Sequence, residues 1–145
     1  MSFRFPLAAV LMVRENAEKR EEQALQKIQL EVARIANQIA ELNAALAQVR
    51  VIREKALQTP IPAADLHSFL HRLQSLAEAK KTCVHRLQAL ELERDRQMKV
   101  YQAAHRDHET IADMFNEQRD AHEQEQSKSE QKHLDDIFVA RRQRS

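Results

Sequence analysis

The stretch LQKIQLEVARIANQIAELNAALAQV, residues 25–49, decides the fold, because its apolar residues recur in alternating steps of three and four. These residues fill the a positions (Leu25, Val32, Ile39, Leu46) and the d positions (Ile28, Ile35, Leu42, Val49) of four heptads. A strict seven-residue repeat predicts a helix that supercoils in a left-handed sense around a partner helix.

The heptad run ends at Thr59-Pro60-Ile61-Pro62. Each proline lacks an amide donor and biases the residue before it towards extended geometry, so the helix must break here. We predict a first helix over about residues 6–57, which begins near Pro6, and a tip over residues 58–64. Asp65, or the segment 63–65, can open the second helix.

The second helix carries a looser apolar stripe than the first. Its members are Phe69, Leu73, Leu76, Cys83, Leu87, Leu90, Tyr101, Ala104, Ile111 and Phe115. Polar residues interrupt this stripe at Lys80, Arg94 and Gln97. A short break between two amphipathic helices favours an all-α antiparallel coiled-coil hairpin, in which the numbers of facing residues sum to roughly 122.

The second helix also extends past the first. We expect residues 65–120 to be paired and residues 121–145 to form a charged overhang, whose helical or disordered state the sequence leaves open.

The composition excludes most enzyme classes. The 145 residues contain no glycine, which phosphate-binding loops, dinucleotide-binding turns and nucleophile elbows all need. We therefore expect a non-catalytic protein without a cofactor. With 23 basic and 22 acidic residues interspersed, the sequence also predicts no binding of nucleic acid.

The cysteine content and the apolar segments of the sequence indicate where in the cell the protein is expected. The lone Cys83 cannot form an internal disulfide, and no signal-type segment opens the chain, so a reducing cytoplasm is expected. No apolar run is long enough to insert into a membrane, which limits membrane association to peripheral binding.

Three residue pairs have the spacing of metal ligands: His67 with His71, His105 with His108, and Glu130 with His133. Two ligands do not make a metal site, and the residues expected opposite the histidines, such as Arg14 and Ala17, are not ligands. We expect exposed histidines and no metal. Cys83 lies on the apolar stripe and is interpreted as an inert thiol.

Two segments are candidates for binding other proteins. Phe69, Leu73, Leu76 and Lys80 lie near the hairpin tip, where they serve either as a contact surface or as ordinary seam residues. Residues 134–139 contain an isolated apolar cluster, Leu134, Ile137, Phe138 and Val139, beyond the reach of the first helix. The basic residues that follow complement the negative end of the helix dipole.

The opening Phe3-Arg4-Phe5-Pro6-Leu7-x-x-Val10-Leu11-x-x-Arg14-Glu15 resembles the start of the flagellar export protein FliJ. The chain length, the hairpin layout and the closing Glu130-x-Lys132-x-Leu134-Asp135-Asp136 are also similar to that family. The Pro60-Ile61-Pro62 tip departs from it.

This resemblance implies a stalk of the flagellar type III export apparatus, similar to the coiled coil of rotary ATPase γ subunits. Its partners would be the hexameric export ATPase, the cytoplasmic region of the membrane export gate, and export chaperones as further candidates. The implied gate-binding residues are Ile39, Leu42, Phe69, Leu73, Leu76 and Lys80. The implied ATPase-facing residues are Leu7, Leu11, Ile111, Phe115, Leu134, Ile137 and Phe138.

Two alternatives stay open. One is a generic coiled-coil adaptor or a prefoldin-like holdase, which needs an exposed apolar surface for its clients. The other is a metal-dependent helical enzyme, for which the ligands are too few.

Overall fold

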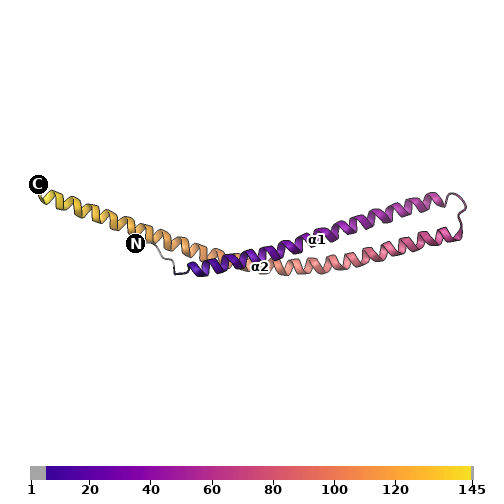
Figure 1. Ribbon diagram of the computed structural model, residues 1–145, viewed down its shortest axis with the longest axis horizontal. Coiled ribbons are helices and arrows are strands. Elements are labelled where there is room, and N and C mark those ends of the chain that lie inside the picture. The colour runs from indigo at the N-terminus through magenta and orange to yellow at the C-terminus, as the bar shows by residue number, and fades with distance from the viewer. Residues whose placement is uncertain (1–5, 145) are drawn as a thin grey trace. The chain divides into compact units, whose positions relative to one another are not determined.

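The computed structural model describes residues 6–144 and contains two helices, α1 (Ala8–Ala56) and α2 (Ala63–Arg144) (Figure 1). The helices pack against each other, and no strand occurs among the described residues. The predicted all-α two-helix hairpin is therefore confirmed.

The helix ends lie where proline and hydrogen bonding place them. The amide of Leu11 donates to the carbonyl of Leu7 at 2.8 Å, so the helical ladder begins directly after Pro6. At the tip, the amide of Thr59 donates to the carbonyl of Ala56 at 3.4 Å, which tightens the last turn before the prolines. Asp65 lies in the first turn of α2, where its negative charge interacts favourably with the positive end of the helix dipole.

The chain divides into two compact units. We call Glu22–Val100 the tip unit, and the residues up to Glu21 together with those from Tyr101 onward the terminal unit.

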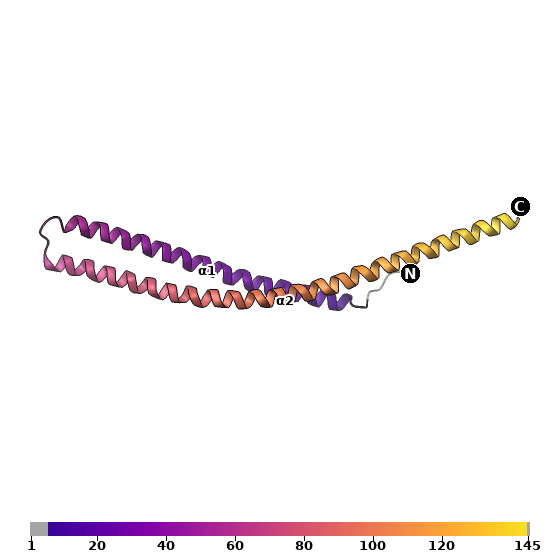
Figure 2. The ribbon, with the colours of Figure 1, turned by 180° about the vertical axis from the view of Figure 1, so that it is seen from behind.

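The tip unit holds the buried core. In it α1 and α2 run antiparallel and side by side in both views (Figures 1 and 2). The buried apolar residues are Leu25, Ile35, Leu46 and Val49 of α1 and Leu90 of α2, each between 3% and 7% exposed. All four α1 residues are predicted a or d residues, and α2 contributes only one side chain, as its looser stripe suggests. The other four heptad residues of α1 are half-buried.

A polar contact in this unit agrees with the expected register. The thiol of Cys83 lies 3.9 Å from Oε1 of Gln38. The two residue numbers sum to 121, close to the 122 expected for the hairpin.

The terminal unit is packed differently. None of its described residues is a buried hydrophobic residue, and its seam consists of half-buried side chains such as Leu11, Ile111 and Phe115. Arg14 and Asp107 pair across the two helices at 3.5 Å, again with numbers that sum to 121.

Beyond Phe115, α2 remains helical to Arg144, and nearly all of its described side chains are exposed. The state that the sequence left open for residues 121–144 is thus helical.

Candidate partner-binding surfaces

The residues expected to contact the export gate lie on the inward face of the tip unit. Ile39 and Leu42 of α1 are half-buried, and so are Phe69, Leu73, Leu76 and Lys80 of α2. Their spacing of three and four residues continues the coiled-coil seam. These side chains therefore pack between the helices and present only their edges to a partner. Their role in gate binding stays a prediction.

Shallow grooves expose some of these edges. Leu42 lines a groove of about 410 Å³ together with Gln38, Glu41, Ala45 and Cys83. Phe69 lines a smaller groove of about 190 Å³ at the tip, against Ala56, Ile61, Asp65 and Ser68.

The tip also carries exposed apolar residues that the sequence analysis missed. They are Val51, Ile52 and Leu57 near the end of α1 and in the tip, and Leu66 and Leu70 in the first turns of α2. Val51, Ile52, Leu57 and Leu70 lie off the heptad seam. Leu66 instead continues the three-and-four spacing of Phe69 and Leu73, and it is 37% exposed where the seam begins. For the four residues off the seam, an apolar residue outside the a and d positions was the sequence signal that could have identified an exposed surface. Their concentration around the tip makes this end suitable for contact with another protein.

In the terminal unit, the residues expected to face the ATPase fall into two groups. Leu7, Leu11, Ile111 and Phe115 are half-buried where α1 and α2 pair.

The second group lies in the unpaired part of α2. Leu134, Ile137 and Phe138 are exposed by 63%, 40% and 68% of their surface, and Val139 is exposed as well. A large apolar side chain such as Phe138, exposed on a helix without a partner, is a candidate anchor for another protein.

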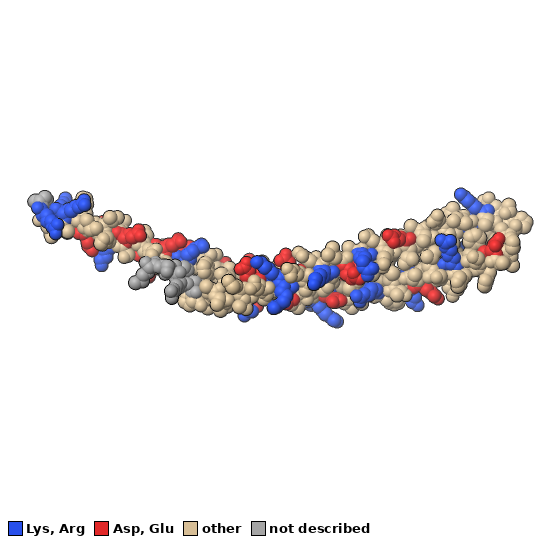
Figure 3. Space-filling model, in the orientation of Figure 1, with Lys and Arg blue, Asp and Glu red and all other residues tan. Residues whose placement is uncertain are grey.

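Charges of both signs occur along much of the chain. On the face shown in Figure 3, Lys and Arg side chains are interspersed with Asp and Glu. Basic side chains gather at the C-terminal end of α2, where Arg141, Arg142 and Arg144 occupy the last turn. There they complement the negative end of the helix dipole.

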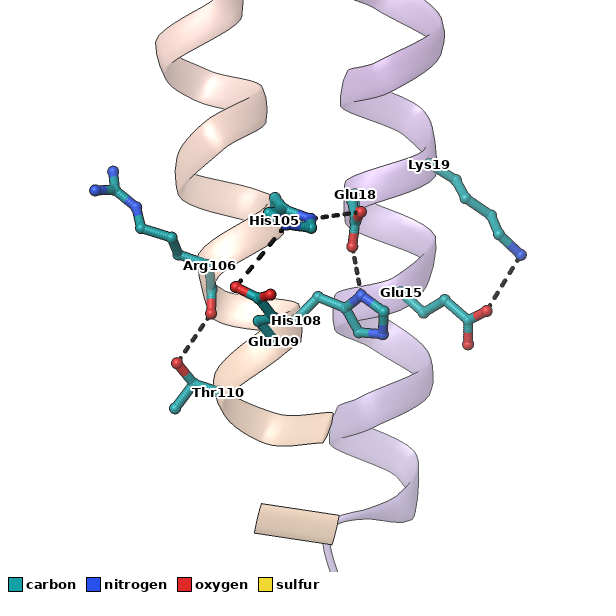
Figure 4. A network of polar contacts seen from close by, with 8 residues as sticks. All are labelled: Glu15, Glu18, Lys19, His105, Arg106, His108, Glu109 and Thr110. Atoms are coloured by element: carbon teal, nitrogen blue, oxygen red, sulfur yellow. Dashed lines mark hydrogen bonds and ion pairs between the residues drawn. The ribbon is translucent and has the colours of Figure 1, made fainter. Parts of the chain in front are cut away.

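A polar cluster replaces apolar packing within the terminal unit (Figure 4). Oε1 of Glu18 lies 3.0 Å from Nδ1 of His105, and its other carboxylate oxygen contacts Nδ1 of His108. The ring of His105 stacks on Tyr101 at 6.0 Å, and its Nε2 lies 3.9 Å from a carboxylate oxygen of Glu109. The Glu18 side chain is only 16% exposed, so one carboxylate joins two α2 histidines at the helix seam.

The expectation that α1 supplies no ligand-type residue opposite these histidines is wrong. The hairpin register places Ala17 and Arg14 at their level, but the acidic side chain of the neighbouring Glu18 reaches both rings. Still, no group of three or more His, Cys, Asp or Glu residues within 6–144 is arranged to hold a metal ion.

The cluster shifts two pKa values in opposite directions. The hydrogen bond to Glu18 raises the pKa of His105 above its ordinary 6.5, against a smaller lowering by desolvation. The hydrogen bond from His105 lowers the pKa of Glu18 below 4.5, partly offset by desolvation and assisted by His108. Both shifts favour the ion pair between the helices.

The model of one protein family, described as the flagellar FliJ protein, matches residues 3–145. The chain belongs to the FliJ family. The match spans nearly the whole chain and includes the N-terminal block on which the resemblance rests. No curated protein and no solved structure matches the chain.

Membership of the FliJ family makes the protein a component of flagellar protein export, and so of flagellum biogenesis. Among the described residues, neither helix has a segment long and apolar enough to cross a membrane.

Proposed function

We propose that this FliJ-family protein is a non-catalytic stalk that links the hexameric export ATPase to the cytoplasmic region of the membrane export gate. The family match carries the proposal, since it makes the chain part of the export apparatus. Two separate apolar surfaces support it, because a linker needs a distinct contact for each partner.

The tip unit is the proposed gate-binding end. Phe69 and Lys80 are accessible at grooves between the helices, and exposed residues such as Leu66 and Leu70 surround them. A large aromatic ring at the edge of a groove is a low-entropy anchor for a partner. Gate binding at this end would hold the protein at the cytoplasmic face of the membrane.

The terminal unit is the proposed ATPase-binding end. It contributes the half-buried Leu7, Leu11, Ile111 and Phe115 and the exposed Leu134, Ile137 and Phe138. A hairpin of two unequal helices presents different side chains to each subunit of a symmetric ring. Such differential contacts are what could favour one subunit conformation over another.

The absence of glycine supports a non-catalytic role, because the chain cannot build a phosphate-binding loop of its own. ATP hydrolysis would therefore be the task of the ring. Export chaperones are further candidate partners, for the same exposed helix of the terminal unit.

Two binding assays test the proposal, one against the purified ATPase and one against the cytoplasmic part of the gate. Phe69→Ala should weaken gate binding and leave ATPase binding intact, whereas removal of residues from Leu134 onward should do the reverse. Leu92→Ala, exposed by 60% in the tip unit, is the control and should change neither. Circular dichroism reports whether each variant is folded.

Equal loss of both partners by each folded variant would overturn the two-ended stalk. A generic adaptor or holdase would then explain the chain better. Suppression of the aggregation of an unfolded client, without stimulation of the ATPase, would identify the holdase.

A further inference from the structure

A groove of about 310 Å³ runs between the two helices of the tip unit. Its lining consists of Leu46 and Arg50 from α1, and Ala77, Lys80, Lys81, Val84 and His85 from α2. Leu46 is buried and Val84 half-buried, so the groove has an apolar floor.

The rim of the groove is positively charged and lacks counterions. Arg50, Lys80, Lys81 and His85 are basic side chains, and no acidic residue lines the groove. Within residues 6–144, none of these four side chains forms an ion pair or a side-chain hydrogen bond.

The lack of pairing is not caused by a shortage of carboxylates along the helices. Glu54 lies one turn beyond Arg50, and Glu78 follows Ala77, yet neither pairs with the rim. Some cations elsewhere do pair along a helix, as Arg34 does with Glu31 and Lys19 with Glu15.

A neighbouring turn of α1, outside the groove lining, holds an unsatisfied donor. Nε of Arg53, one turn beyond Arg50 on α1, is buried and has no hydrogen-bond partner within the described residues. A buried donor without an acceptor costs stability, but Arg53 does not line the groove, so the binding site inferred below consists of the groove residues alone.

We infer that this groove binds an acidic segment of a partner protein, with apolar side chains of that segment on Leu46 and Val84 and its carboxylates on the basic rim. The inference rests on the proposed function for the identity of the partner, the protein bound at the tip. Charge complementarity between the rim and the segment supplies specificity and speeds encounter.

A peptide fits the groove better than a polyanion. Proteins that bind DNA electrostatically neutralise several phosphates along a positively charged surface, whereas here one arginine and two lysines surround an apolar floor. The near-neutral chain, with a net charge of +1, adds no wider positive field.

The test uses the full chain and a fluorescent synthetic helix-forming peptide rich in glutamate and leucine, with fluorescence anisotropy as the readout. The double substitution R50Q/K81Q should weaken binding about fivefold or more, because two rim charges are lost. The matched double substitution K27Q/R96Q removes one Lys and one Arg from other exposed positions of the tip unit and should leave binding unchanged. A peptide with glutamine in place of glutamate should bind weakly to all three proteins.

Carbodiimide cross-linking gives a second readout that does not depend on variants. It should join peptide carboxylates to Lys80 or Lys81 in preference to Lys27 or Lys99. Equal peptide binding by both double variants, or cross-links spread over all lysines, would overturn the inference. The inference would also be overturned if R50Q/K81Q weakened the binding of a single-stranded oligonucleotide or of phosphatidylserine vesicles more than the binding of the peptide.

Failure of the proposed function is a separate result. If the wild-type chain does not bind the gate's cytoplasmic part while the peptide results hold, the gate assignment is wrong and the groove remains an acidic-segment site.

Discussion

Truncation of Ile35 to alanine should destabilise the hairpin more than most single changes, because this side chain is only 4% exposed in the tip unit. The substitution removes three carbons, worth about 0.8 kcal/mol each, or roughly 2.4 kcal/mol of lost burial. The cavity left behind adds to this cost. Alanine's higher helix propensity offsets roughly 0.5 kcal/mol of it. We expect a net loss of about 2 to 3 kcal/mol in the free energy of unfolding.

Urea unfolding followed by circular dichroism at 222 nm measures this loss directly. Leu30→Ala is the matched control, because Leu30 lies on the same helix and is 72% exposed, so its truncation should cost less than about 0.5 kcal/mol. Ile39→Ala should fall between the two, since Ile39 is half-buried. If Ile35→Ala and Leu30→Ala lose equal amounts, the apolar seam has been assigned to the wrong helix face.

Three further predictions concern the terminal unit and the tip unit. The contribution of Glu18 to stability, measured as the unfolding difference between wild type and Glu18→Gln at each pH, should be largest between about pH 4.5 and 6.5. This contribution should decrease as the pH rises through the raised pKa of His105, because the imidazole then loses its charge. It should also decrease as the pH falls through the lowered pKa of Glu18, because the carboxylate is then protonated. A difference that stays constant from acid to alkaline pH would contradict the ion pair. Leu134→Ser combined with Phe138→Ser should leave the unfolding free energy within about 0.5 kcal/mol of wild type, since both side chains are exposed. A larger loss in chemical denaturation would mean that the cluster packs within the chain or between copies of it. Phe69→Ala should cost more than Leu70→Ala, because Phe69 is half-buried in a groove and Leu70 is exposed; thermal melts that rank them in the opposite order would place Phe69 outside the seam.

The sequence predicted the fold well because every step towards it was local. The steps of three and four from Leu25 to Val49 fix which face of α1 is apolar, and the prolines at residues 60 and 62 end the helix regardless of its surroundings. An antiparallel hairpin with a register near 122 then follows from chain connectivity, and Cys83 and Gln38 meet accordingly.

The candidate sites were less predictable from sequence. A heptad pattern says that Phe69 and Leu73 face the partner helix, but it does not say how much of each side chain stays accessible at the edge of the seam. The exposed Leu70 was overlooked because it belongs to no periodic stripe, and Leu66 was overlooked because the stripe was taken to begin three residues later, at Phe69. They form part of a candidate contact surface because the end of α1, with the exposed Val51 and Ile52, belongs to the same tip, and this proximity is a property of the tertiary structure.

The sequence by itself determined two amphipathic helices, the break between them and the seam, because helix periodicity and proline geometry act over a few residues. The family match over residues 3–145 also rests on the sequence alone. Only the tertiary structure decided that Glu18 contacts both His105 and His108, and that Arg50 of α1 faces the same groove as Lys81 of α2. These neighbours come from opposite helices and depend on the interhelical distance and on side-chain rotamers. Neither quantity is encoded in the pattern of one helix, so the polar cluster and the basic groove arise only when the hairpin closes.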